Sequence, residues 1–226
     1  MSERVKIILD KNADILRLPA IALRGLVVFP GNIIHFEVGR KKSIAAIEWA
    51  MSNNNAVFLT AQQDMDVEDP GFKDLYAYGV VAEVKQVLRV SDELVKVLVE
   101  GKYRAKLLTL DSSGRFLLAS TKAAALRGTK SVDSARVEAL VRSVKEAFEE
   151  YLSLNPRLSK DVVYTIITNE DAALLCDYIP ANLLLKYTDK QALLNEGTVS
   201  GRLEKLLEIL RRETKILHIE KDIQSK

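Results

Sequence analysis

The first 122 residues contain short runs in which apolar and polar positions alternate. Residues 34, 36 and 38 are apolar and alternate with His35 and Glu37, and the runs 79–90 and 94–100 alternate in the same way. Because successive side chains of a strand point to opposite faces, this period of two predicts strands with one buried face. The two later runs are joined by Ser-Asp-Glu and predict an antiparallel hairpin. Its buried face is expected to comprise Val80, Ala82, Val84, Leu88, Val90, Val95, Val97 and Val99.

Breaks in the pattern predict the connections between these strands. Pro30 and Gly31 predict a corner between two short strands, since proline has no N–H to donate and glycine tolerates a positive φ. Gly101 is expected to end the second arm of the hairpin, and Ser-Ser-Gly at 112–114 to turn the chain into a last strand. The unbroken apolar run 56–59 predicts a strand that is buried on both faces.

One helix is expected within this strand-rich part. Ser43 is predicted to be its N-cap, because Ile44, Ile47 and Met51 follow at helical spacing. Short strands with one inserted helix predict a small barrel or a pair of packed sheets, and the pattern leaves both open.

From residue 131 the apolar spacing becomes helical. A stripe at i, i+3, i+4 and i+7 predicts a helix that ends near Asn155-Pro156, and shorter helices are expected at 158–168, 170–178 and 182–194. The stripe comprises Val137, Leu140, Val141, Val144, Phe148 and Tyr151. We therefore predict an α+β chain with a β domain at 1–122, a linker at 123–130 and a helical bundle at 131–198.

Residues 199–226 repeat apolar positions every seven residues. This period predicts a long helix that packs along another helix or leaves the domain as a coiled coil, with packing on its own bundle as the alternative. Gly201 is expected to weaken its first turn by about 1 kcal/mol. The residues expected to mediate self-association or interdomain packing are Leu203, Leu206, Ile209, Leu210, Ile216 and Leu217.

Composition narrows the functional classes. The 226 residues are 48% apolar and 28% charged, and the formal net charge is +2, so nucleic acid is not a favoured partner. No apolar run approaches the ~20 residues of a membrane-spanning helix, and a cytoplasmic location is expected. Cys176 is the only cysteine, so it has no partner for an internal disulfide, and its apolar context predicts a buried side chain.

The motifs of catalysis and metal binding are absent from the sequence. Gly128-Thr129-Lys130 lacks the upstream glycine of a phosphate-binding loop, and Ser159-Lys160 are neighbours, which do not face each other on a helix. His35 and His218 are the only histidines, too few for a typical zinc site in a chain with one cysteine. The acidic run at 64–69 lacks the glycine and the final glutamate of a calcium loop. We expect no catalytic residue, cofactor or metal in this chain.

The segment 17–43, RLPAIALRGLVVFPGNIIHFEVGRKKS, resembles the start of the N-terminal domain of Lon-type ATP-dependent proteases, whose pattern is close to LPLxPLRxxVVFPGxxxxxxVGRxxS. The pieces DPGFKDLYAYGVVAEV, LVKVLVEGKYRAKL and RLEKLLEIL are similar to later parts of that family. The resemblance implies a PUA-like β fold followed by a helical bundle. The matching residues of the opening segment, expected to determine the fold, include Leu18, Pro19, Leu23, Arg24, Phe29, Pro30, Gly31, Gly39 and Arg40.

The same resemblance implies a non-catalytic function. The chain would engage unfolded or degron-bearing proteins and help to organise a hexamer, while ATP, magnesium and peptide cleavage belong to modules outside this chain. The residues that contact substrate are not predicted. Two alternatives are a free-standing adaptor that carries the same domain and, because PUA-like folds include RNA readers, an RNA-binding protein.

Overall fold

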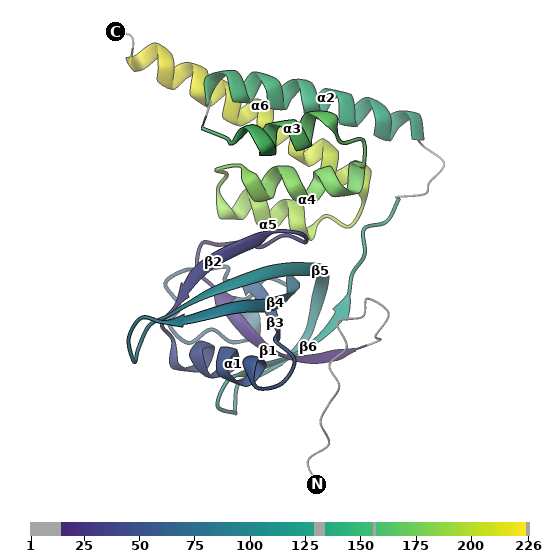
Figure 1. Ribbon diagram of the computed structural model, residues 1–226. Coiled ribbons are helices and arrows are strands. Elements are labelled where there is room, and N and C mark those ends of the chain that lie inside the picture. Colours follow the sequence, from purple (N-terminus) through teal and green to yellow (C-terminus); the bar gives the residue numbers. More distant parts are fainter. Residues whose placement is uncertain (1–14, 129–133, 156, 225–226) are drawn as a thin grey trace. The chain divides into compact units, whose positions relative to one another are not determined.

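A computed structural model describes residues 15–128, 134–155 and 157–224 (Figure 1). The chain forms two compact units, 1–125 and 126–226. The first unit contains the β-strands and the second contains helices, so the predicted α+β class is confirmed. The long final helix belongs to the same compact unit as the helical bundle.

The first unit is a closed six-stranded sheet. Its strands follow the order β2-β5-β4-β3-β1-β6, and β5 also pairs with β6, which closes the sheet into a barrel. The pairing of β1 with β3 is parallel, and the other pairings are antiparallel. The strands are β1 (Leu16–Leu23), β2 (Ile33–Val38), β3 (Ala56–Ala61), β4 (Tyr78–Arg89), β5 (Val95–Asp111) and β6 (Leu117–Ala123).

The barrel core is made by side chains of β1, β3, β4, β5 and β6. Leu18, Phe58 and Val81 are fully buried in it, and every residue of β3 is buried, as the unbroken apolar run predicted. Helix α1 (Lys41–Met51) packs against β1 and β3, and a short 3-10 turn, η1 (Phe72–Asp74), precedes β4.

Gly101 does not end the hairpin arm as expected, because β5 continues through it to Asp111. A Cβ atom at this position would lie 2.2 Å from the carbonyl oxygen of Phe29. The glycine therefore permits the close approach of the corner, where Gly31 N donates to Gly101 O at 2.8 Å. The corner itself is as predicted, with Gly31 at a φ of +75°. It follows an irregular segment, since β1 already ends at Leu23.

The expected buried face of β4 is wrong at its far end. The register with β5 shifts between Val84 and Gln86, a β-bulge that moves the following side chains to the opposite face. Leu88 is consequently 59% exposed and Val90 is 56% exposed, whereas Val87 is half-buried.

Ser43 is not the N-cap of α1. The helix begins at Lys41, with Arg40 in the extended N-cap conformation, and Ser43 is buried within the first turn. The Arg40 carbonyl accepts the first helical hydrogen bond, from Ile44 N at 2.9 Å. The helix starts early because Gly39 ends β2 just before it and the Arg40 side chain is held by the end of β1.

The second unit is a bundle in which α2 and α6 lie side by side (Figure 1). The ion pair Arg136–Glu204, at 2.5 Å, and the approach of His218 Nε2 to Glu150 Oε1, at 3.7 Å, show that the two helices run parallel. The N-caps of α3 and α4 are Ser159 and Asp171, whose side chains accept backbone hydrogen bonds. The helices are α2 (Ser134–Leu154), α3 (Lys160–Thr168), α4 (Ala172–Asn182), α5 (Tyr187–Asn195) and α6 (Val199–Gln224).

A buried arginine fixes the start of α6. Arg202 is fully buried and pairs with Asp177, while its Nη2 donates to Glu196 O at 3.1 Å. Gly201 is required beside it, because a Cβ atom there would lie 2.7 Å from Thr198 Oγ1. That oxygen accepts a hydrogen bond from Gly201 N at 3.2 Å, so the glycine allows the helix to be capped rather than merely weakening it.

Candidate functional site

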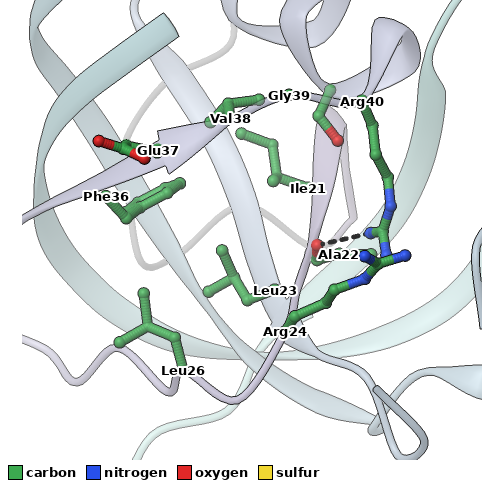
Figure 2. A pocket seen from close by; sticks show the side chains of 11 residues that line it. Ile21, Ala22, Leu23, Arg24, Leu26, Phe36, Glu37, Val38, Gly39 and Arg40 are labelled. Carbon is green, nitrogen blue, oxygen red and sulfur yellow. Dashed lines mark hydrogen bonds between the residues drawn. The ribbon is translucent and has the colours of Figure 1, made fainter. Parts of the chain in front are cut away.

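A groove of about 320 Å³ opens on the first unit (Figure 2). It is lined by residues of the segment 17–43, which carries the family resemblance and is called the signature segment below. Its walls come from the end of β1, the irregular segment that follows, the end of β2 and the start of α1. It is lined by Ile21, Ala22, Leu23, Arg24, Leu26, Phe36, Glu37, Val38, Gly39, Arg40 and Ser43.

The floor of this groove is apolar. Ile21 and Leu23 are buried in β1, and Leu26 and Phe36 are half-buried and present part of their surface to solvent. Figure 2 shows the side chains of Leu23, Leu26 and Phe36 around the same hollow. A partly exposed apolar hollow of this kind suits the side chains of a polypeptide that has lost its own core.

Arg40 forms one end of the groove and is held in place by three acceptors. Its Nη1 donates to Ala22 O at 3.1 Å, and its Nη2 donates to Gln62 Oε1 and to Val67 O at 3.3 Å. Burial lowers the pKa of Arg40, the positive charge of Arg24 lowers it further, and Asp69 opposes this shift. The guanidinium is thus partly desolvated and lies near a like charge.

Arg24 extends the basic end of the groove toward solvent. Its side chain is exposed, and its Nη2 donates to Val67 O at 3.4 Å. Figure 2 shows its guanidinium beside that of Arg40, while Glu37 lies on the opposite side of the groove. The two arginines also line a second hollow of about 410 Å³, together with Lys41, Lys42, Glu68 and Asp69.

The lining residues are suited to binding rather than to catalysis. They combine apolar side chains with two guanidinium groups and one carboxylate, that of Glu37, and the one hydroxyl, that of Ser43, is buried in the first turn of α1. In the part of the chain that the structure describes, no group of three or more histidine, cysteine or acidic residues could hold a metal ion. Within the same residues, no helix is long and apolar enough to cross a membrane.

The remaining sequence candidates are not among the residues that line this groove. Cys176 is buried in the helical unit, and burial raises the pKa of its thiol to about 12. His35 is exposed on β2, and His218 lies 3.7 Å from Glu150 on the bundle surface. Of the weak phosphate-loop candidate, Thr129 and Lys130 lie outside the described residues.

The signature residues lie in different surroundings. Leu18, Pro19 and Phe29 are buried, Leu23 is buried in the floor of the groove, and Arg24 and Arg40 line its basic end. Pro30 and Gly31 form the corner, and Gly39 ends β2 within the groove wall. Sequence reasoning treated both arginines as fold-determining and did not identify Leu26 or Phe36 as groove residues. The signal in the sequence that could have indicated the groove was that Arg24 and Arg40 each follow closely after the end of an apolar strand.

The residues expected to mediate self-association also divide. Leu203, Leu206, Ile209 and Leu210 are buried within the bundle of a single chain. Ile216 is 38% exposed and Leu217 is half-buried. Among these six residues, those with exposed apolar surface therefore lie on the later turns of α6. The role of this helix in self-association remains a prediction.

The chain is similar to a known protein family, to curated relatives and to solved structures. Residues 17–212 match the ATP-dependent protease La (LON) substrate-binding domain. The Lon protease of Desulforamulus reducens is 38% identical over 212 residues, which are 94% of this chain and 26% of that protein. The Lon protease of Escherichia coli K12 is 36% identical over 216 residues, which are 96% of this chain and 27% of that protein. The chain thus spans about a quarter of the length of these relatives.

Two solved structures share the fold. The N-terminal domain of Mycobacterium avium complex Lon protease matches with a TM-score of 0.70 at 20% identity, covering 87% of this chain and 98% of that one. A Lon N-terminal domain protein from Xanthomonas campestris matches with a TM-score of 0.59 at 15% identity, covering 85% of this chain and 98% of that one. The family match and the extent of the sequence identity show that this chain belongs to the Lon substrate-binding domain family.

Proposed function

We propose that this chain is the non-catalytic, substrate-engaging region of a Lon-type ATP-dependent protease and that the groove beside β2 binds apolar segments of client proteins. The clients would be unfolded proteins or proteins that carry an exposed degron. The observation that carries this proposal is the half-buried surface of Phe36 and Leu26 over the apolar floor formed by β1. An unfolded segment can cover that surface, and a folded protein that hides its apolar residues cannot.

Catalysis belongs to other modules in this proposal. ATP and magnesium would be bound, and peptide bonds cleaved, in parts of a parent protease that this chain does not contain. The chain itself would have neither ATPase nor peptidase activity. We also propose a cytoplasmic location and a hexameric parent, as the relationship to Lon proteases suggests.

Binding to such a groove is expected to be weak and broad. Covering one large apolar side chain contributes roughly 1.5–3 kcal/mol, from which the cost of ordering an unfolded segment must be subtracted. Weak binding suits a module that must release its client to the ATP-hydrolysing module of the protease. Several copies in an oligomer would raise the overall affinity through effective concentration without any new contact.

The proposal is tested by placing a charge in the groove. Phe36→Asp should weaken binding of a reduced, carboxymethylated and permanently unfolded protein by about 10-fold, because the lost apolar contact is worth more than 1.4 kcal/mol. Fluorescence anisotropy with the labelled unfolded protein measures this affinity. Leu88→Asp is the matched control, because Leu88 is exposed on β4 and does not line the groove.

Thermal unfolding of each variant establishes whether it is folded. Leu26→Asp provides a second groove variant on the irregular segment in case Phe36→Asp fails to fold. If both groove variants fold and bind the unfolded protein as tightly as the unmodified chain, the groove is not the client site. Turnover of ATP or of a peptide by a pure sample would overturn the non-catalytic part of the proposal.

A further inference from the structure

Strand β2 has one free edge. It stands last in the sheet order, and its register from Ile33↔Glu100 to Val38↔Val95 pairs it with β5. Among the described residues, no element pairs with its other side. A free edge carries a row of backbone N–H and C=O groups that can accept another extended chain.

The pairing pattern identifies which residues supply those groups. Gly101 N donates to Asn32 O at 2.9 Å, so this pair is hydrogen-bonded across the two strands. In an antiparallel ladder, hydrogen-bonded and non-hydrogen-bonded pairs alternate. Since Asn32 belongs to a hydrogen-bonded pair, the backbone groups of Ile34, Phe36 and Val38 also point toward β5. The backbone groups of Ile33, His35 and Glu37 therefore face the free edge.

The groove lies at the far end of this strand. Phe36, Glu37 and Val38 belong both to β2 and to the groove wall, and the opposite wall is the end of β1. A chain that paired with β2 would direct alternate side chains toward this hollow, since successive side chains of a strand point to opposite faces. Ile33, 63% exposed at the start of β2, lies on the face opposite to Phe36 and would contact the other alternate set of side chains of the bound chain.

Within the described residues, the two arginines at the basic end of the groove have no ion-pair partner, although the negative charge of Asp69 acts on Arg40. Both guanidinium groups donate to backbone carbonyls. Lys42 differs, because its Nζ lies 3.1 Å from Asp69 Oδ1. Burial and, after it, the repulsion from Arg24 lower the pKa of Arg40, and a carboxylate from a ligand would relieve that repulsion.

We propose that the groove binds an extended client segment as an added strand on the free edge of β2, with apolar side chains in the hollow and an acidic side chain against Arg24 and Arg40. This inference rests on the proposed function and specifies its substrate class. The acid is a side chain within the segment rather than a chain terminus, because both arginines also line the second hollow and the bound chain can continue past them.

The test uses nine-residue peptides of alternating valine and threonine with one central glutamate, labelled for fluorescence anisotropy. Two versions are N-methylated, each on a different alternate set of amides. Because a strand directs only one alternate set toward its neighbour, we expect one version to lose at least about 10-fold in affinity and the other to bind like the parent peptide.

The role of the arginines is tested by a double-mutant cycle. A peptide with glutamine in place of glutamate should bind the unmodified chain about 5- to 10-fold more weakly, since a charge-assisted hydrogen bond is lost. Arg24→Gln should reduce the preference for glutamate, because only Arg40 then remains to pair with it, and the advantage of glutamate in the unmodified chain should decrease as salt is added. Lys106→Gln, an exposed position outside both hollows, is the control and should retain the preference.

The outcomes separate this inference from the proposed function. Equal binding of the two N-methylated versions would overturn strand addition, and equal binding of the glutamate and glutamine peptides would overturn the acidic specificity. If either result occurs while Phe36→Asp still weakens binding of the unfolded protein, the groove is the client site but the client is not recognised in the way proposed here.

Discussion

The Arg40 side chain donates a hydrogen bond to Gln62 Oε1, which links the start of α1 to the end of β3. Gln62 is fully buried, and its Nε2 donates to Asp64 O at 3.0 Å and to Val67 O at 2.9 Å. Val67 O also accepts from Arg40 Nη2. The arginine at the end of the groove thus organises three segments that are distant in the sequence.

Arg40→Ala should destabilise the chain by about 2–3 kcal/mol, because several hydrogen bonds from a charged group are lost and the buried Gln62 Oε1 is left without its donor. Urea unfolding measures the change. Arg24→Ala is the control, since its exposed side chain makes one long hydrogen bond and its loss should cost less than about 0.5 kcal/mol. Equal stability of the two variants would contradict the organising role of Arg40.

Gly101→Ala should destabilise the barrel by about 3 kcal/mol or more, because the added methyl group would lie 2.2 Å from Phe29 O and force the corner away from β5. Gly114→Ala is the matched control: the nearest atom to its added methyl group lies 3.7 Å away. Thermal unfolding of both variants should show a large loss for the first and little change for the second. A small effect at Gly101 would mean that the corner is free to move.

Sequence patterns predicted the fold where neighbouring residues determine it. The period of two located the strands, and the unbroken apolar run located β3 because a strand that is buried on both faces carries apolar side chains at successive positions. The bulge after Val84 could not be predicted, since the shift depends on the pairing with β5 and not on the local pattern. Gly101 was read as a strand terminator for the same reason, because its requirement comes from the distant carbonyl of Phe29.

The candidate groove was only partly accessible to sequence reasoning. Arg24 and Arg40 stand out in the signature segment, yet nothing in their spacing places the two guanidinium groups side by side. Their proximity results from the closure of the barrel, which brings the end of β1 against the start of α1. Motif reasoning found these residues, and the tertiary structure was needed to group them with Phe36 and Leu26.

The buried thiol of Cys176 should make stability depend on pH. Burial raises its pKa in the folded state from an ordinary value near 9.0 to about 12. The unfolded chain therefore loses this proton first as the pH rises, so the thiol's contribution is fully present below pH 9 and is lost progressively toward pH 12. The stability difference between the unmodified chain and Cys176→Ala should decrease when urea unfolding is repeated between pH 8 and pH 10.

The same burial protects Cys176 from reagents. At pH 8 the folded chain should react with a disulfide reagent far more slowly than the urea-unfolded chain, because the thiolate is the nucleophile and is disfavoured by burial. Rapid and complete labelling of the folded chain would show that α4 opens readily.

The last turns of α6 carry apolar side chains that the bundle leaves exposed. Ile216, Ile219 and Ile223 are 38%, 50% and 69% exposed, and their spacing places them along one side of the helix. We expect the chain to self-associate at high concentration through this stripe, since an exposed row of isoleucine side chains is covered by a second helix in a coiled coil.

Ile219→Asp combined with Ile223→Asp should keep the chain monomeric at concentrations where the unmodified chain associates, as measured by sedimentation equilibrium. Unfolding should be unchanged, because neither side chain is buried in the bundle. Leu210→Asp should behave differently: Leu210 is fully buried, so a charge there should unfold the helical unit by creating an unpaired buried carboxylate. If the unmodified chain sediments as a monomer at every concentration, its exposed isoleucines do not bind another copy and a different partner must cover them.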